Sequence, residues 1–177
     1  MRIIAGSRKG STIFAPKGGT RPTGDRVREA AFNLIGPVDD MAVLDLFAGS
    51  GAMGLEALSR GAASAVFVES DRHAQRAIER NLEKLELKGA RIVKSDARRA
   101  LATEVAAGRR YDLVLVDPPY RMLDSLLPNL SKYLPALLAE DGLVVIESSA
   151  KEQPSLPLAE RTSRTYGSAR VTLFEHP

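Results

Sequence analysis

Apolar residues along this chain change their spacing several times, from the spacing of a helix face to short continuous runs and back. The first amphipathic stretch places five apolar residues on one helix face before Gly36: Val27, Ala30, Ala31, Leu34 and Ile35. Residues 42–47 form a short apolar run, which is typical of a buried strand, and a helical stretch follows at 53–60. The pattern therefore predicts strands that alternate with helices.

The same alternation continues toward the end of the chain. Further strands are predicted at 64–68, 91–93, 113–116 and 143–147, and further helices at 71–87, 98–106 and 125–138. Two last runs, 161–166 and 169–175, are separated by Gly167 and Ser168 and predict a closing hairpin. Near-continuous apolar strands between helices are typical of a mostly parallel sheet covered on both faces. The predicted fold class is therefore α/β and Rossmann-like.

The N-terminus predicts a separate small element. Two short runs, 2–5 and 11–15, flank the sequence GSRKG and indicate a hairpin with a basic tip. At 177 residues with 44% hydrophobic content, the chain is long enough for one core and short for two. We therefore expect one domain over residues 1–177, with residues 1–20 as a basic hairpin extension.

Composition narrows the chemistry. The chain has no cysteine, which excludes disulfides, thiolate catalysis and cysteine-ligated zinc. Its two histidines, His73 and His176, are far apart in sequence, so no metal site is expected. No run approaches the roughly 20 apolar residues of a membrane span, and we expect a soluble, monomeric, cytoplasmic protein.

Charge is uneven along the chain. Residues 1–35 contain seven basic and two acidic side chains, a balance of +5, and the net charge of +3 leaves about −2 for the remainder. Such an excess suggests a polyanionic partner, because phosphates are bound mainly by Lys and Arg. A merely solvated N-terminus remains the alternative.

A glycine-rich loop follows the first core strand. In VLDLFAGSGAMG, Gly49, Gly51 and Gly54 have GxGxxG spacing, and Glu69 lies 18 residues after Gly51, at the end of the next strand. In open α/β sheets this arrangement binds a nucleotide-like ligand, with the acid on the ribose hydroxyls. Three glycines that only form tight turns remain possible.

Asp45 bears on which ligand binds. A carboxylate just ahead of the glycines is unfavourable for a pyrophosphate at a helix N-terminus but favourable for a cation. S-adenosylmethionine carries a sulfonium and an ammonium group and no phosphate, so it fits better than a dinucleotide. Asp45 could instead be a buried acceptor for backbone N–H groups. Asp96, after the third strand, could accept from an adenine amino group or cap a helix, and both interpretations stay open.

The stretch LVLVDPPY, residues 113–120, ends a buried strand on a carboxylate, two prolines and a tyrosine. Proline has no N–H and fixes its own φ, so the corner is rigid and rich in acceptors. Prolines also simply end strands, which is the structural alternative.

Taken together, DLFAGSGAMGLEALSRGA, FVES, SDA and LVDPPY resemble the class I S-adenosylmethionine-dependent methyltransferases that modify exocyclic amines. With RIIAGSRKG and RPTGDRVREAAFN, the chain resembles the bacterial RsmD family, which methylates N2 of a guanine in small-subunit ribosomal RNA. The resemblance covers nearly the whole chain. It implies a seven-stranded sheet with the last strand antiparallel.

The resemblance also implies site residues. Cofactor contacts are expected at Asp45, Phe47, Ala48, Gly49, Ser50, Gly51, Glu69, Ser70, Asp96 and Ala97. The target base is expected at Asp117, Pro118, Pro119 and Tyr120. Contacts with ribosomal RNA, naked or in a partly assembled small subunit, are expected at Arg2, Arg8 and Lys9 because of the basic N-terminal hairpin, and the resemblance adds Arg21, Thr23 and Arg26. As chemistry alone, the stretch 21–26 would be a helix cap.

A chemical reason supports the base assignment. The lone pair of an exocyclic amine is delocalised into its ring, so two acceptors must hold the N–H bonds and direct the lone pair at the methyl group. The Asp117 carboxylate and the Pro118 carbonyl can do this, and Tyr120 can stack on the base. Transfer to adenine N6 or to a protein glutamine amide, a nicotinamide-dependent oxidoreductase, and a non-catalytic RNA-binding factor remain as rival functions.

Overall fold

The computed structural model describes residues 1–15 and 24–177, and within the latter range it does not describe the Tyr120 side chain. The predicted RNA contacts Arg21 and Thr23 therefore lie outside the described residues, and so does the predicted stacking ring of Tyr120.

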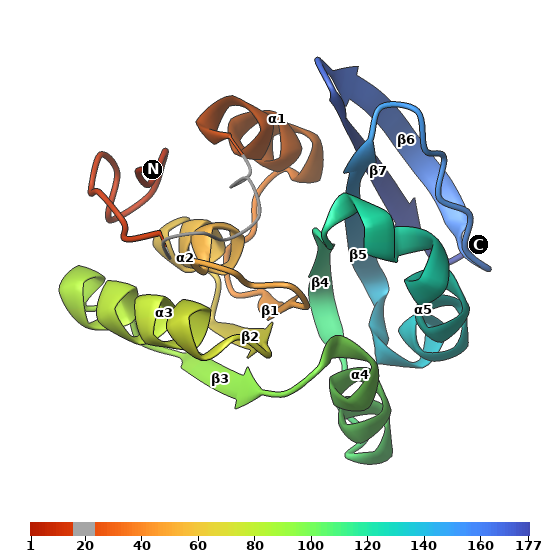
Figure 1. Cartoon of the computed structure of the whole chain (residues 1–177), viewed down its shortest axis with the longest axis horizontal. Coiled ribbons are helices and arrows are strands. Elements are labelled where there is room, and N and C mark those ends of the chain that lie inside the picture. Colours follow the sequence, from red (N-terminus) through yellow and green to blue (C-terminus); the bar gives the residue numbers. More distant parts are fainter. Residues whose placement is uncertain (16–23) are drawn as a thin grey trace.

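The described part of the chain folds around a seven-stranded sheet of order β3-β2-β1-β4-β5-β7-β6 (Figure 1). The strands are β1 (Ala42–Asp45), β2 (Ser64–Glu69), β3 (Ala90–Lys94), β4 (Tyr111–Val116), β5 (Leu138–Ser149), β6 (Ala159–Tyr166) and β7 (Ala169–Glu175). β1 to β5 pair in parallel, and β7 runs antiparallel to both β5 and β6. The α/β fold with an antiparallel last strand is thus confirmed.

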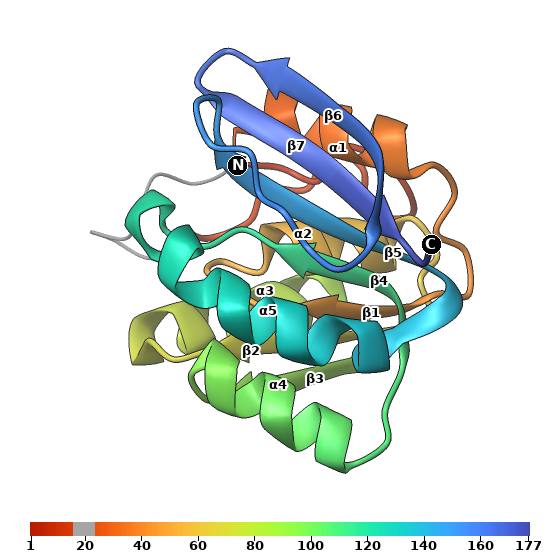
Figure 2. The ribbon, with the colours of Figure 1, turned by 90° about the vertical axis from the view of Figure 1, so that its right-hand side faces the viewer.

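Helices cover both faces of the sheet. The helices α1 (Asp25–Ile35), α2 (Ala52–Ser59) and α3 (Arg72–Leu85) pack on one face, and α4 (Ala97–Ala106) and α5 (Leu123–Leu137) on the other (Figure 2). Alternate residues of each strand enter opposite cores, as Val43 and Leu44 of β1 do. A short 3-10 turn, η1 (Tyr120–Met122), precedes α5.

Element boundaries agree with the sequence pattern within a few residues except at β5. The predicted strand 143–147 starts in the structure at Leu138, directly after α5 ends at Leu137. Leu138 pairs with Tyr111, and the register shifts before Leu113. The polar residues 140–141 and Gly142 are typical of a loop, so the sequence pattern did not predict that the strand begins at Leu138.

The N-terminal hairpin differs from its prediction. Instead of two continuous strands, residues 1–15 have one antiparallel bridge, Arg2 with Thr12. The backbone N–H groups of Ile4 and Ala5 donate to the buried carboxylate of Glu56 on α2, at 2.8 and 3.0 Å. A side chain therefore satisfies donors that a strand ladder would otherwise use.

In the described ranges, every helix is too short or too polar to cross a membrane.

Candidate active site at the carboxyl edge of the sheet

The carboxyl ends of β1, β2 and β4 bring the predicted acids to one edge of the sheet. β1 lies between β2 and β4, with Asp45 opposite Phe67 on one side and Leu115 on the other. Glu69 ends β2, and Asp117 directly follows β4. The chain order reverses between β1 and β4, which is the position where open α/β sheets bind ligands.

The glycine loop between β1 and α2 has the backbone that its sequence predicted. Gly49 and Gly51 have positive φ values of 54° and 82°, and the Gly51 N–H donates to the Ala48 carbonyl at 2.6 Å. A Cβ on Gly49 would meet nothing within 4 Å, so the loop borders open space there. The Gly49 N–H donates to the Glu69 carboxylate at 2.8 Å, which holds the loop against the end of β2.

Gly54 has a packing role. A Cβ at this position would lie 2.4 Å from the Phe67 ring, so only glycine lets α2 approach β2 this closely. The close approach also brings the Gly54 N–H within 3.0 Å of the Asp45 carboxylate. Gly54 thus joins the helix, the sheet and the acid.

Asp45 is 2% exposed and lies among other acids. Burial is the main cause that raises its pKa, the hydrogen bond from Gly54 lowers it, and repulsion from Asp117 and Glu69 raises it, so that the pKa is about 7. The backbone-acceptor alternative from the sequence is therefore observed. This hydrogen bond does not exclude the ligand role. A cation beside Asp45 would offset both the desolvation cost of its buried charge and the repulsion from the other acids.

Asp96 caps α4. Its side chain accepts from the Arg98 N–H at 2.9 Å, while the following Ala97 is buried. The helix-cap interpretation is thus observed, and the contact with an adenine amino group stays a prediction. Asp96 is exposed, and so is Ser70 at the end of β2.

The DPP corner turns the chain from β4 into η1. Asp117 is half-buried, Pro118 is buried, and the Pro119 carbonyl accepts the Met122 N–H at 2.8 Å. The Pro119 carbonyl is thus used by the turn itself. The corner therefore has a fixed shape, set by the two prolines and this hydrogen bond.

Asn81 is a residue that the sequence analysis missed. It is fully buried on α3, and its amide Nδ2 donates to the carbonyls of Phe14 and Ser50, both at 2.9 Å. Its Oδ1 accepts the Phe14 N–H at 2.7 Å. Asn81 thus ties the N-terminal segment to the glycine loop. The sequence contained one indication of this role. Asn81 lies one helical turn after Ala77, on the otherwise apolar stripe of α3, where a polar side chain needs hydrogen-bond partners.

The predicted RNA contacts have different environments. Arg2, Lys9 and Arg26 are exposed. Arg8 is half-buried, where its Nε donates to the Leu85 carbonyl and its Nη2 lies 3.6 Å from Glu86. Arg8 therefore also fastens the N-terminal segment to the end of α3.

Arg28, one of the seven basic residues behind the N-terminal excess, is fully buried. It pairs with Asp25 at 2.9 Å and with Glu56 at 3.6 Å. One of these charges is therefore structural, and the exposed excess is smaller than the sequence indicates.

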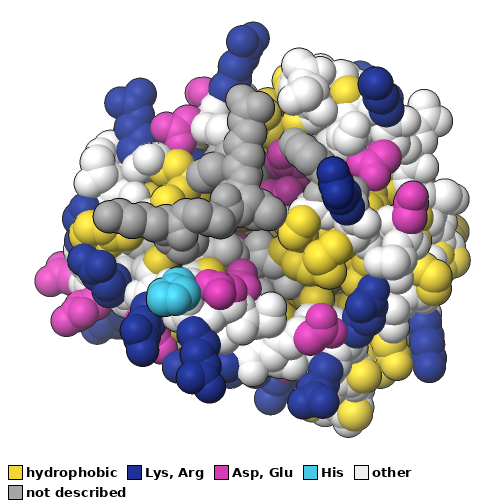
Figure 3. All heavy atoms as spheres, viewed as in Figure 1, with side chains coloured by type: hydrophobic (Ala, Val, Ile, Leu, Met, Phe, Trp, Pro, Cys, Tyr) yellow, Lys and Arg dark blue, Asp and Glu magenta, His cyan; other side chains and the backbone are white. Residues whose placement is uncertain are grey.

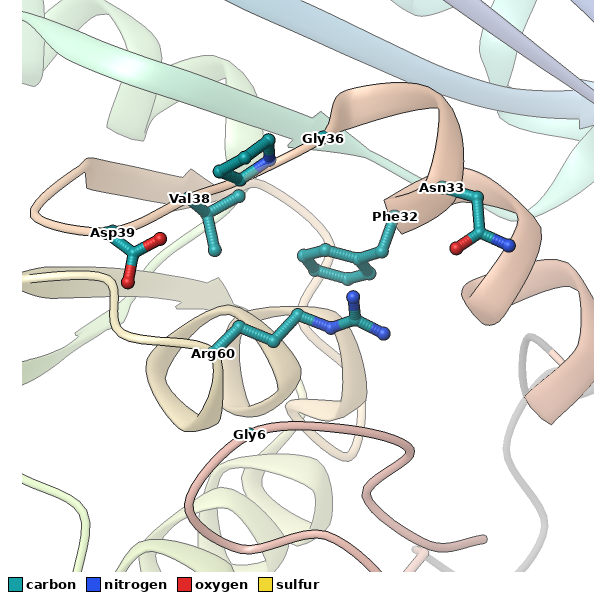
Figure 4. Close-up of a pocket in the computed structure, with 8 residues that line it drawn as sticks. Gly6, Phe32, Asn33, Gly36, Val38, Asp39 and Arg60 are labelled. Carbon is teal, nitrogen blue, oxygen red and sulfur yellow. The ribbon is translucent and has the colours of Figure 1, made fainter.

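A separate pocket lies away from these acids. It has a volume of about 390 Å³ and is lined by Gly6, Phe32, Asn33, Gly36, Pro37, Val38, Asp39 and Arg60 (Figure 4). Arg60 points at the Phe32 ring, 4.6 Å from its centroid, and pairs with Glu56 at 2.8 Å. These residues precede β1 or end α2, so the pocket is at the amino edge of the sheet and contains none of the predicted site residues.

Known proteins are similar to this chain in sequence and in fold. Residues 1–175 match the model of the family described as Conserved hypothetical protein 95. Ribosomal RNA small subunit methyltransferase D of Escherichia coli K12 is 41% identical over 89% of this chain and 79% of its own. YlbH of Bacillus subtilis, a candidate rRNA methyltransferase, is 40% identical over 99% of this chain and 98% of its own. The solved structure of yhhF, a candidate methyltransferase from Escherichia coli, superposes with a TM-score of 0.86 at 37% identity, covering 99% of this chain and 97% of that one.

Proposed function

The chain belongs to the Conserved hypothetical protein 95 family, the RsmD family that its motifs resemble, and from this premise we propose its reaction. It transfers a methyl group from S-adenosylmethionine to the exocyclic N2 amine of a guanine in small-subunit ribosomal RNA. Naked RNA or a partly assembled subunit is the partner, and the cytoplasm is the compartment.

The buried acid beside the glycine loop is the observation that carries the proposal. Asp45 is nearly inaccessible, and burial, together with repulsion from neighbouring acids, raises its pKa to about 7. A cationic ligand relieves this repulsion, whereas the phosphates of a nicotinamide dinucleotide would add to it. S-adenosylmethionine supplies a methyl group on a positively charged sulfur. The Asp45 carboxylate, the Gly49 to Gly51 backbone and Glu69 would hold this cofactor.

Glu69 can keep its present partners in its predicted role. Its carboxylate now accepts the N–H groups of Gly49 and Asp71, both at 2.8 Å. Each carboxylate oxygen has a second lone pair, so a ribose hydroxyl can donate to Glu69 without breaking either bond. Glu69 then holds the loop and the ligand together.

The DPP corner orients the target amine. The Asp117 carboxylate and the Pro118 carbonyl each accept one N–H of the guanine N2 amine, which directs its lone pair outward. Asp117 also stabilises the positive charge that develops on the nitrogen during transfer. Because Pro118 is buried and Pro119 is fixed by its bond to Met122, these acceptors require little reorganisation.

Methyl transfer to unmodified small ribosomal subunits and to their naked RNA tests this function. Labelled S-adenosylmethionine is the donor, and the modified nucleoside is identified by mass spectrometry. We expect N2-methylguanosine from the wild type and a rate about 10² to 10³ times lower from Asp117→Ala, the usual cost of removing one preorganised electrostatic contact.

Asp124→Ala is the matched control, because it removes an exposed carboxylate from the first turn of α5, seven residues further along the chain. It should transfer at the wild-type rate. Label in methyladenosine or in a protein amide would keep the DPP corner and refute the guanine assignment. No transfer to any of these acceptors would refute the methyltransferase proposal.

A further inference from the structure

Phe14 is the large apolar side chain that the described part of the chain leaves exposed, at 41%. It lies against α3, on the N-terminal segment. Both of its backbone polar groups bond to the buried Asn81 amide, at 2.7 and 2.9 Å. An exposed aromatic ring is therefore held on a fixed backbone, although burying it would be favourable.

Two cations of α3 lie at this ring. The Arg80 guanidinium carbon is 4.2 Å from the Phe14 ring centroid, and the Lys84 ammonium is 5.0 Å from it. Lys84 also donates to the Thr12 carbonyl and hydroxyl, at 2.6 and 2.8 Å. Arg80 has no carboxylate within ion-pair distance among the described residues. The cations thus lie on an aromatic ring, which leaves their charge available to an anion.

The exposed surface of α3 is divided by charge. Successive residues turn by 100° along a helix, so Arg76, Arg80 and Lys84 form one stripe beside Phe14. Glu79 and Glu83 form a second stripe, and Glu79 pairs with Lys94 of β3 at 2.9 Å. Lys and Arg side chains accordingly gather over α3 at the lower left of the face in Figure 3.

This surface is joined to the glycine loop. The Asn81 amide that holds Phe14 also donates to the Ser50 carbonyl at 2.9 Å. Ser50 is one of the residues predicted to hold the cofactor. The Asn81 side chain therefore links the Phe14 backbone directly to the glycine loop, and α3, which carries the basic stripe, lies on the same face of the sheet as this loop.

We propose that Phe14, Arg76, Arg80 and Lys84 form an RNA-binding surface that holds unpaired nucleotides flanking the target base. Phosphates bind the three cations, and a base stacks on the Phe14 and Arg80 unit. Cations interleaved with an exposed aromatic side chain are the features that bind single strands, whereas a duplex needs the cations alone. This inference rests on the proposed function, because it takes RNA as the substrate.

Binding of fluorescently labelled, unmodified small-subunit ribosomal RNA over a range of salt concentrations tests the surface. Arg80→Glu combined with Lys84→Glu is expected to weaken binding by at least about tenfold. The slope of log Kd against log salt should fall by about 1.4, which corresponds to two lost phosphate contacts on a single strand. Phe14→Leu, which keeps an apolar side chain of similar size, should weaken binding about fivefold, the low end of the effect of one stacked base.

Arg99→Glu combined with Lys132→Glu is the matched control. It makes the same change in net charge on α4 and α5, on the opposite face of the sheet, and Lys132 also lies 5.0 Å from an aromatic ring, that of Tyr133. The control should change RNA affinity less than twofold. All three variants should keep the S-adenosylmethionine affinity of the wild type and unfold in one cooperative transition, which excludes misfolding as the cause.

Equal weakening in the α3 variant and the control, or none in either, would overturn the α3 surface. Methyl transfer to RNA by the wild type separates this failure from failure of the proposed function. If the wild type transfers methyl to RNA while the α3 variant binds RNA normally, only the surface is refuted. If the wild type neither binds nor methylates RNA, both are refuted.

Discussion

Buried carboxylates occur in two kinds of surroundings in this molecule. Glu56 and Glu104 are inaccessible, yet each lies among arginines. Asp45 is just as inaccessible and lies among acids. The two glutamates belong to the scaffold, and the aspartate belongs to the candidate active site.

The negative charges of the two scaffold acids, Glu56 and Glu104, are balanced by arginines. Arg60 pairs with Glu56 at 2.8 Å. Glu104 accepts from Arg91 at 2.8 Å, from Arg109 at 2.7 Å and from the Tyr111 hydroxyl. Burial would raise the pKa of Glu104, but the bonds from Arg91, Tyr111 and Arg109 hold it below its usual value. Burial and the bond to Glu104 raise the pKa of Tyr111 to about 12.

The difference shows how this fold separates stability from function. A compensated buried acid stabilises the structure only while its partners remain, since an unpaired buried charge is costly. An acid that faces other acids is destabilising until something cationic arrives. The carboxyl edge of the sheet therefore carries unbalanced charge that a ligand can balance, and such perturbed groups concentrate at functional sites.

Breaking a compensated acid should have the largest effect. Arg91→Ala combined with Arg109→Ala leaves the buried Glu104 carboxylate without its two cations, and we expect the free energy of unfolding to fall by about 3 to 5 kcal/mol. Urea unfolding measures this change. Glu79→Ala, which removes a half-exposed acid paired with Lys94, should cost less than about 1 kcal/mol. Similar losses in both variants would contradict the comparison.

Removing the charge of Asp45, the uncompensated acid, should raise the free energy of unfolding instead of lowering it. The pKa of Asp45 rises from 3.8 to about 7 in the folded chain, so the folded state holds the proton more tightly than the unfolded state does. The stability that this group contributes is complete below pH 4 and is lost as the pH rises to about 7. Asp45→Asn keeps an acceptor for Gly54 and should stabilise the ligand-free protein at pH 8.

The gain at pH 8 has a ceiling of about 4 kcal/mol, because a shift of about three units corresponds to roughly 1.4 kcal/mol each. At pH 4 the variant should be no more stable than the wild type. Thermal unfolding at both values measures the difference. The same variant should bind S-adenosylmethionine at least about tenfold more weakly, since it removes the charge opposite the cation. A variant that is less stable at pH 8 and binds normally would place Asp45 with the scaffold acids.

The neighbouring acids should have the smallest effects. Repulsion from Asp117 raises the pKa of Asp45 more than repulsion from Glu69 does. Asp117→Asn should therefore lower the pH at which stability levels off by more than Glu69→Gln does, each by less than about one unit. Unfolding across pH 4 to 9 gives both midpoints, and the reverse order would mean that the acids are arranged differently.

Much of the fold followed from the sequence because local periodicity decides it. The stripe of α3 and the apolar runs of β1 and β4 each specify one element, and the glycines at 49 and 51 specify the loop. The prediction of a full N-terminal hairpin was wrong because the Glu56 carboxylate accepts the N–H groups of Ile4 and Ala5. This contact joins residues about fifty positions apart in the sequence.

Long-range partners also explain what was missed in the site. The acids at 45, 69 and 117 were predicted singly; they end or follow three different strands, and their grouping depends on strand order, which spacing does not give. Asn81 and Glu56 are polar residues on buried helix faces, and their partners could not be read from spacing. The charge count also included Arg28 because spacing does not show that Asp25 and Glu56 enclose it.

Proton release during cofactor binding tests most directly whether Asp45 is an uncompensated acid that waits for a cation. Calorimetric titration of S-adenosylmethionine at pH 6, in two buffers with different ionisation enthalpies, measures the protons released. The wild type should release about one proton at pH 6 and almost none at pH 8, because ligand binding ionises an acid with a pKa of about 7. Asp45→Asn should release none at either pH. Equal binding heats in both buffers for the wild type at pH 6 would contradict the account.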